Sequence, residues 1–177
     1  MKKELIIRSN SSAVDFAMLS EGRLVELNKE VGENKFSVGD IFVAKIRKTI
    51  HGLNAAFVNV GHEKDGFLHY HDLGPKLLSL SKFVDQIDTK KVKSFSFSKF
   101  DFEKDIPKNG LIGDCLKAKQ TTLVQIIKEP ISTKGPRLSS EISLAGRFMV
   151  LIPFSERISI SQKIKSQDEK KRLKNLV

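Results

Sequence analysis

The sequence predicts a mainly β protein built around a small five-stranded barrel that carries a helical insertion. Two observations lead to this prediction. From Gly39 onward, five short runs rich in β-branched and aromatic residues are separated by glycine, proline and polar residues, a pattern typical of strands joined by turns. An interval at about residues 72–113 separates the third run from the fourth, and it opens with a helical pattern.

The part of the chain that precedes the barrel contains two strand-like segments, residues 4–8 and 22–28. They lie on either side of a polar stretch with turn character. We expect the two segments to form the edge of a hairpin.

The five predicted barrel strands follow in the order GDIFVAKIRKTI, LNAAFVNVG, DGFLHY, TTLVQIIKEP and RLSSEIS. The insertion begins with a predicted short helix in LGPKLLSLSKFV and continues through a stretch rich in Lys, Ser and Phe. An oligonucleotide-binding (OB) barrel has its variable, often helical, connection at this place, so we expect an OB-type barrel. After the barrel, AGRFMVLIPF predicts one more buried strand, and the tail from about Ser166 predicts a charged helix.

Composition limits the classes of partner. Lys and Arg number 31 against 21 Asp and Glu, and the net charge of +10 favours a polyanion, either a nucleic acid or an anionic membrane surface. No apolar run approaches the roughly 18 residues of a membrane span, and MKKELIIRSN lacks the apolar core of a signal peptide. The single Cys115 forms no internal disulfide and suits a reducing compartment. We therefore expect a cytoplasmic protein without membrane association.

Side-chain alternation in the second and third predicted strands locates an aromatic surface. If Val58 and Leu68 point into the core, then Phe57, Phe67 and His69 point outward. Antiparallel pairing through the VGHEKDG turn would make the outer aromatic side chains cross-strand neighbours. Single-stranded bases stack on such rings with roughly 1–3 kcal/mol each. The pattern therefore predicts a surface that binds single-stranded RNA.

Two basic residues of the first predicted strand, Lys45 and Arg47, would supply phosphate contacts at the border of this surface. The alternative for these two residues is an ordinary solvated strand face. For Phe57 and Phe67 the alternative is core packing, since phenylalanine is usually buried. For His69 it is a structural hydrogen bond.

Specific motifs add a family resemblance. NAAFVNVG, DGFL, VQIIKEP, TKGPRLS and ISLAGRF occur here in the order in which they occur in the bacterial ribonuclease E and G family, and the chain resembles the amino-terminal region of that family. The resemblance implies an RNA-binding barrel of the ribosomal protein S-one type at residues 37–142. It also implies an incomplete ribonuclease-H-like α/β subdomain, split between residues 1–36 and 143–177.

The resemblance also implies roles for individual residues. Phe57 and Phe67 would stack on RNA, in agreement with the alternation argument. Lys128 and Lys134, before and within the loop of KEPISTKG, would meet phosphates, the alternative being solvated loop lysines. His69 aligns with a histidine of the general barrel motif, GLVHISEL, although this family's motif does not require it.

Enzymes of this family cut RNA with a magnesium ion held by paired aspartates in a downstream nuclease-like part. The chain does not reproduce that pair, so we expect neither catalytic residues nor a cofactor here, and expect Mg²⁺ only in a full-length enzyme. Asp101, Glu103 and Asp105 have strand spacing, but we do not favour a metal site there. A full-length form would contain the missing downstream part and any contacts of a homo-oligomer.

The insertion contains Phe95, Phe97, Phe100 and Phe102 among lysines. This stretch is either a second nucleic-acid surface or, as we favour, a segment whose phenylalanines pack it against the barrel. For the whole chain, we expect the substrate-capturing portion of a single-strand-specific endoribonuclease of RNA processing and decay. The alternative is a noncatalytic RNA-binding module or adaptor that docks on another ribonuclease or on the ribosome.

Overall fold

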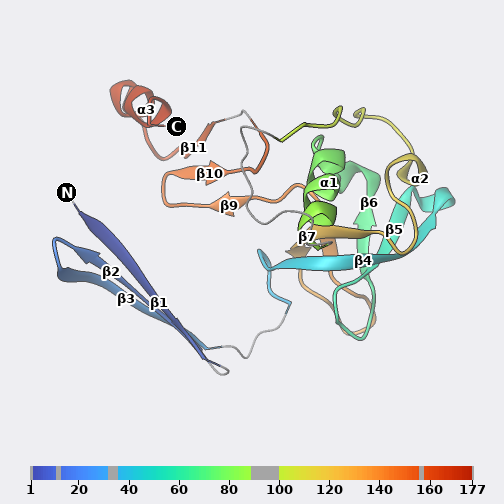
Figure 1. Cartoon of the computed structure of the whole chain (residues 1–177), viewed down its shortest axis with the longest axis horizontal. Coiled ribbons are helices and arrows are strands. Elements are labelled where there is room, and N and C mark those ends of the chain that lie inside the picture. Colours follow the sequence, from blue (N-terminus) through green and yellow to red (C-terminus); the bar gives the residue numbers. More distant parts are fainter. Residues whose placement is uncertain (1, 11–12, 32–35, 89–99, 156–157, 177) are drawn as a thin grey trace. The chain divides into compact units, whose positions relative to one another are not determined.

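The computed structural model describes residues 2–10, 13–31, 36–88, 100–155 and 158–176. The chain forms two compact units, Met1–Ser37 and Val38–Val177. Each unit has its own sheet structure and is described separately below (Figure 1).

The first unit is an antiparallel sheet of β1 (Lys3–Ser9), β2 (Ala13–Ser20) and β3 (Arg23–Val31), with β2 in the middle. The expectation of a hairpin edge with an intervening turn was incomplete, because the supposed polar stretch contains β2. Its sequence, AVDFAMLS, lacks a clear alternation and includes weak strand formers. Pairing with a strand on each side stabilises β2 where its local preference does not.

The second unit contains a closed barrel, which confirms the predicted fold class. Its strands are β4 (Ile41–Ile50), β5 (Ala55–Asn59), β6 (Gly66–His69), β7 (Thr121–Lys128) and β8 (Arg137–Ser139), in the spatial order β4-β5-β6-β8-β7 (Figure 1). All neighbours are antiparallel except β6 and β8, which are parallel. This closed mixed barrel agrees with an OB-type fold.

The barrel interior is apolar and includes Val58 and Leu68, the two residues that alternation assigned to it. Each strand contributes at least one side chain with at most 1% exposure, among them Ile46, Val58, Leu68, Ile126 and Leu138. Burying an aliphatic side chain to this extent contributes about 1.5–3 kcal/mol. Because inward residues are fixed in this way, their sequence neighbours on each strand must face outward.

The insertion contains the predicted helix, α1 (Leu77–Asp88), and a short helix, α2 (Ile112–Cys115). The helix α1 begins at Leu77 rather than at Leu73, because Gly74 and Pro75 come before it and the N–H of Leu77 donates to the carbonyl of Gly74. The helix packs against β7. Asn54, with a left-handed φ of 45°, connects the start of β5 to the insertion through hydrogen bonds with Gly110 and Ile112.

After the barrel, β9 (Leu144–Ala145), β10 (Met149–Leu151) and β11 (Ser159–Ile160) form a small antiparallel sheet with β10 in the centre. The prediction of one buried strand in AGRFMVLIPF was wrong. Gly146 to Phe148 make a turn that divides the segment, and Leu151 is exposed. Gly146 and Arg147 are a turn signal within this run. The apolar residues that follow them led to the prediction of a single continuous strand.

The predicted charged helix is present as α3 (Gln167–Lys174). Ser166 caps it by accepting a hydrogen bond from the N–H of Glu169 at 3.3 Å. Acidic residues occupy its first turn and basic residues its last, as the helix dipole favours. Within the ranges described above, no helix has the length and apolar character needed to cross a membrane.

Candidate nucleic-acid interface

One residue from each barrel strand forms a continuous row on the outer surface. Backbone pairing places Lys48 opposite Phe57, Phe57 opposite Phe67, Phe67 opposite Arg137, and Arg137 opposite Lys128. The row therefore has two aromatic rings and an arginine between two lysines. We call these five residues the cross-barrel row.

Phe57 and Phe67 are the aromatic pair of this row. They are half-buried, whereas their strand neighbours Val58 and Leu68 have no exposed surface. The ring centres are 5.9 Å apart at an interplanar angle of 70°, an edge-to-face contact. The structure therefore places both rings on the outer face and brings them into direct contact.

Two β-bulges determine which lysines enter the row. The register shifts between Ile46 and Lys48 in β4, and between Ile126 and Lys128 in β7. A bulge adds one unpaired residue to a strand and so shifts the alternation by one position. The residue after the bulge, which would otherwise point into the barrel, therefore points outward. Lys48 consequently lies over Phe57, with Nζ 5.4 Å from the ring centre, a distance suited to a cation–π interaction.

Sequence reasoning missed Lys48 because strict alternation in β4 would point it inward after Ile46. No glycine or proline marks the bulge in IFVAKIRKTI. We find no signal in this strand that would have revealed it.

The two residues predicted from β4 lie elsewhere. Arg47 forms an ion pair with Asp65, with 3.1 Å between Nε and Oδ1. Lys45 is exposed and pairs across the sheet with Asn59. Neither side chain lines the groove described next.

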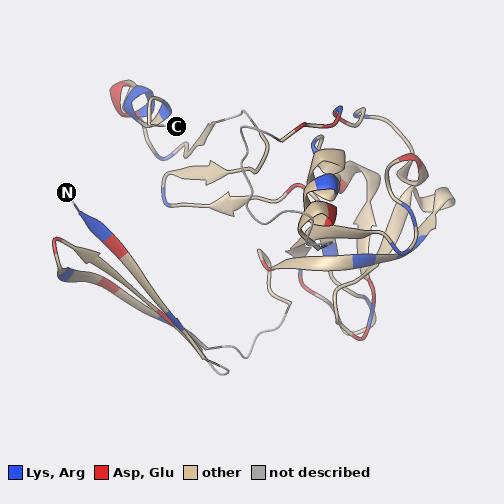
Figure 2. Cartoon of the chain, in the orientation of Figure 1, with Lys and Arg blue, Asp and Glu red and all other residues tan. Residues whose placement is uncertain are grey.

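A groove of about 680 Å³ contains the cross-barrel row and the loops beside it. Five of its side chains are cationic and two are acidic. Lys and Arg occur along β4 and in the connections around the barrel (Figure 2). The lining residues are Lys48, Phe57, Lys64, Asp65, Phe67, Lys128, Glu129, Ile131, Thr133, Lys134, Gly135 and Arg137.

The β7–β8 loop forms one wall of the groove and contains Lys134. Ile131 and Lys134 close its tip through two backbone hydrogen bonds of 3.0 and 2.6 Å. Gly135 brings this loop against the β5–β6 loop, since a Cβ there would lie 2.1 Å from the carbonyl oxygen of Asp65. Lys128 and Lys134 are both exposed at the edge of the groove.

His69 is on the same outer face, half-buried, with its ring centre 6.4 Å from that of Phe67. Its Nδ1 accepts a hydrogen bond from the N–H of His71 at 3.1 Å and thereby caps the short 3-10 helix η2 (Tyr70–Asp72). In the neutral ring this bond puts the proton on Nε2, which then is a donor. The histidine thus has the structural hydrogen bond that was its alternative role, and it also lies beside the aromatic pair.

Asp101, Glu103 and Asp105 of the insertion pair with Lys82 of α1 and with Lys76, which precedes α1, rather than with one another. Lys82 Nζ lies 3.2 Å from Asp101 Oδ2 and 2.7 Å from Glu103 Oε1, and Lys76 Nζ lies 2.8 Å from Asp105 Oδ1. Hydrogen bonds with Glu103 and Asp101 raise the pKa of Lys82. Among the residues that the structure describes, no three His, Cys, Asp or Glu side chains form a metal-binding group.

The described phenylalanines of the insertion pack against other aromatic rings. Phe100 and Phe102 contact each other and Phe154, and Phe100 also contacts Phe83 of α1, at centroid distances of 5.0–6.4 Å. Phe100 is buried and Phe102 is half exposed. Packing is therefore the role of these two, while Phe95 and Phe97 lie outside the described residues.

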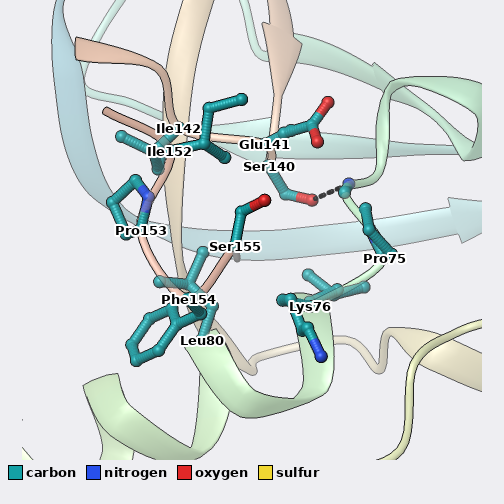
Figure 3. Close-up of a pocket in the computed structure, with 12 residues that line it drawn as sticks. Pro75, Lys76, Leu80, Ser140, Glu141, Ile142, Ile152, Pro153, Phe154 and Ser155 are labelled. Atoms are coloured by element: carbon teal, nitrogen blue, oxygen red, sulfur yellow. Dashed lines mark hydrogen bonds between the residues drawn. The ribbon is translucent and has the colours of Figure 1, made fainter. Parts of the chain in front are cut away.

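A second cavity lies beside this aromatic cluster, between the start of α1 and residues 152–155 (Figure 3). At the edge of this cavity, the Oγ of Ser140 accepts a hydrogen bond from the N–H of Gly74. The cavity volume of about 30 Å³ suits a water molecule rather than a nucleotide. The larger, basic groove is therefore the candidate site.

Comparison with known proteins supports the resemblance seen in the motifs. A family model described as the ribonuclease E/G family matches residues 143–177. The chain is 33% identical over 177 residues to ribonuclease E of Nostoc sp., covering 99% of this chain and 21% of that protein. It is 31% identical over 174 residues to ribonuclease G of Haemophilus influenzae, covering 98% of this chain and 32% of that protein.

A third relative is the ribonuclease E/G-like protein of Pyropia yezoensis, 38% identical over 147 residues, or 82% of this chain and 24% of that protein. The similarity to these proteins therefore includes the barrel, which the family model does not match. The chain spans about a fifth to a third of the length of the curated relatives that it matches.

Proposed function

We propose that this chain, which is related along its whole length to the ribonuclease E/G family, captures single-stranded RNA on the cross-barrel row. The observation that carries the proposal is the directly paired Phe57 and Phe67 inside a groove with five cationic and two acidic side chains. RNA bases stack on the flat aromatic rings, and the lysines at both ends of the row donate hydrogen bonds to phosphate oxygens.

The proposed roles follow from the positions of the side chains. Phe57 and Phe67 stack on bases, and Lys48, Lys128 and Lys134 contact phosphates. His69 donates from Nε2 to the RNA beside Phe67. Lys45 and Arg47 contribute at the border outside the groove, where Arg47 already has Asp65 as a partner.

The strength of binding can be bounded. Two stacked bases contribute roughly 2–6 kcal/mol in total, which by itself corresponds to dissociation constants from tens of millimolar to tens of micromolar. Stacking is nearly indifferent to base identity, because every base has a flat face. Weak RNA binding with little base specificity suits the substrate-capturing part of an enzyme whose catalytic residues lie in another part of the protein.

We therefore also propose that the parent protein is an endoribonuclease of RNA processing and decay in the cytoplasm, and that Mg²⁺ acts in a nuclease-like part outside residues 1–177. Asp101, Glu103 and Asp105 do not fit such an ion, because Lys82 of α1 and Lys76 just before it pair with them. The full-length protein would supply the remaining subdomain and any homo-oligomer contacts. Here residues 1–36 and 143–177 serve as the two pieces of the split subdomain and residues 37–142 as the RNA-binding barrel.

The test is fluorescence anisotropy of a labelled single-stranded RNA with this chain at several salt concentrations. We expect weak, salt-sensitive binding, and a loss of roughly 2–6 kcal/mol when Phe57 and Phe67 are both replaced by Ala. The control variant is Phe148→Ala, which removes an exposed ring outside the groove. Equal affinities of the double variant and the wild type, with the fold intact by circular dichroism, would refute the proposal.

A further inference from the structure

Arg137 is the third flat side chain of the cross-barrel row. It lies on β8 directly beside Phe67 of β6, and Phe67 in turn lies directly beside Phe57 of β5. All three side chains line the groove. Neighbouring strands are about 4.8 Å apart, so the three side chains follow one another at a short, regular interval.

Asp72 holds the guanidinium of Arg137 in one orientation. Arg137 donates from Nε to Oδ2 of Asp72 at 2.9 Å and from Nη2 to Oδ1 at 3.1 Å. This two-point contact fixes the guanidinium plane relative to the carboxylate, which a single bond would not do. The side chain of Asp72 is 15% exposed and that of Arg137 is 43% exposed, so the pair is anchored on the aspartate side and open on the arginine side.

Asp72 is itself fastened to the strand that carries Arg137. Its backbone carbonyl accepts hydrogen bonds from the N–H of Ser140 and from the Oγ of Ser139, both at 3.0 Å. The backbone of Asp72 is therefore fixed relative to β8. Its carboxylate in turn holds the guanidinium of Arg137 in one position.

This arrangement suits stacking better than phosphate binding. Asp72 already supplies a negative charge to the guanidinium, which reduces the gain from a second anion at the same group. The flat face of a guanidinium remains a surface on which a base stacks, as in other proteins that bind single-stranded RNA. The lysines at the ends of the row have no such plane and act as point charges.

We propose that Arg137, held flat by Asp72, is a third base-stacking surface in line with Phe57 and Phe67, so that the barrel holds three consecutive bases of single-stranded RNA. This inference rests on the proposed RNA-binding function. The inference gives Arg137 a role in base stacking, in addition to its positive charge and its ion pair with Asp72.

The test counts stacked bases at constant charge. A set of labelled oligoribonucleotides of equal length carries zero, one, two, three or four consecutive adenines, with abasic sugars elsewhere, and is titrated against the whole chain by anisotropy. For the wild type we expect affinity to rise with each of the first three bases and then to level off. The third step should be about 2- to 30-fold, the range of cation–π contacts.

Two variants separate stacking from charge. Arg137→Ala and Arg137→Lys should both lose the third step and keep the first two, although Lys retains the positive charge. Lys128→Ala should lower the affinity of every oligonucleotide by a similar factor and keep all three steps, because it removes a phosphate contact. Thermal unfolding of each variant establishes that the chain is folded at the temperature of the titration.

The outcomes also separate this inference from the function on which it rests. No rise in affinity from any base in the wild type would refute RNA stacking on the barrel altogether. A wild type whose affinity levels off after two bases, or a folded Arg137→Lys variant that keeps the third step, would overturn the role of Arg137 and leave the two phenylalanines in place.

Discussion

Lys48 lies directly across the sheet from Phe57, with its ammonium nitrogen 5.4 Å from the centre of the ring. A bulge in β4 produces this relationship, because it turns Lys48 outward two residues after the inward Ile46. The lysine thus has both a contact with the stacking ring and a position at one end of the groove.

Lys48→Ala should weaken RNA binding several-fold at low salt and lower the salt slope by about 0.7, the value for one phosphate contact of a single strand. Anisotropy titrations over a range of salt concentrations measure both quantities. The control is Lys108→Ala, an exposed lysine of the insertion that does not line the groove. Equal losses for the two variants would show that the RNA does not follow the cross-barrel row at this end.

Replacing Lys128 and Lys134 together by Ala should flatten the salt slope by about 1.4, because two phosphate contacts are removed. The Phe57 and Phe67 double variant should instead lose affinity with nearly the same slope as the wild type. Lys117→Ala serves as the control, since this lysine is exposed and does not line the groove. An unchanged slope in the double lysine variant would contradict the phosphate role of the β7–β8 loop.

Mg²⁺ should have no effect on this chain by itself. Lys82 is bonded to both Asp101 and Glu103, and a cation would have to displace its ammonium group. We expect equal thermal unfolding with Mg²⁺ and with EDTA, and intact RNA on a denaturing gel after incubation with either. Cleavage that requires Mg²⁺ and survives further purification would show that catalytic carboxylates are present in residues 1–177.

The barrel could be predicted because local signals and tertiary packing agree there. In β5 and β6 the alternation of Val58 and Leu68 with Phe57 and Phe67 corresponds to a real difference between interior and surface. The predicted start of α1 was a few residues too early, because Gly74 and Pro75 delay the helix to Leu77. The strand β2 was missed because its pairing partners, not its own sequence, determine its conformation.

The candidate site could be predicted in part. The aromatic pair follows from period-two alternation, and Lys128 and Lys134 follow from the family motif. Lys48 depends on a bulge that leaves no mark in the sequence, and Arg137 depends on the parallel pairing of β6 with β8, which are far apart in the chain. Register between distant strands is a property of the closed barrel and not of either strand.

Stability should fall with rising pH once the ordinary thiol pKa is passed. Burial raises the pKa of Cys115, with a further contribution from Asp114. A raised pKa means that the folded chain keeps its thiol proton at a pH where the unfolded chain has lost it. The associated stability is therefore complete below about pH 8.5 and declines above it.

Urea unfolding at pH 7.5, 8.5 and 9.5 measures this decline, and Cys115→Ser should make it shallower. Alkylation of the native thiol should be slow at pH 8 and should become rapid on unfolding. A native thiol that reacts as fast as free cysteine at that pH would contradict the raised pKa.

Gly135→Ala should destabilise the chain and weaken RNA binding together. The added Cβ would lie 2.1 Å from the carbonyl oxygen of Asp65 and 2.9 Å from that of Lys64, so backbone on both sides of the groove must move. Relief of such a clash costs about 1–3 kcal/mol and shifts the loop that carries Lys134. Gly52→Ala is the matched control, because no atom lies within 4 Å of its added Cβ. Urea unfolding measures the stability of both variants, and anisotropy measures their RNA binding. A Gly135→Ala variant as stable as Gly52→Ala would mean that the β7–β8 and β5–β6 loops do not meet at Gly135 in solution.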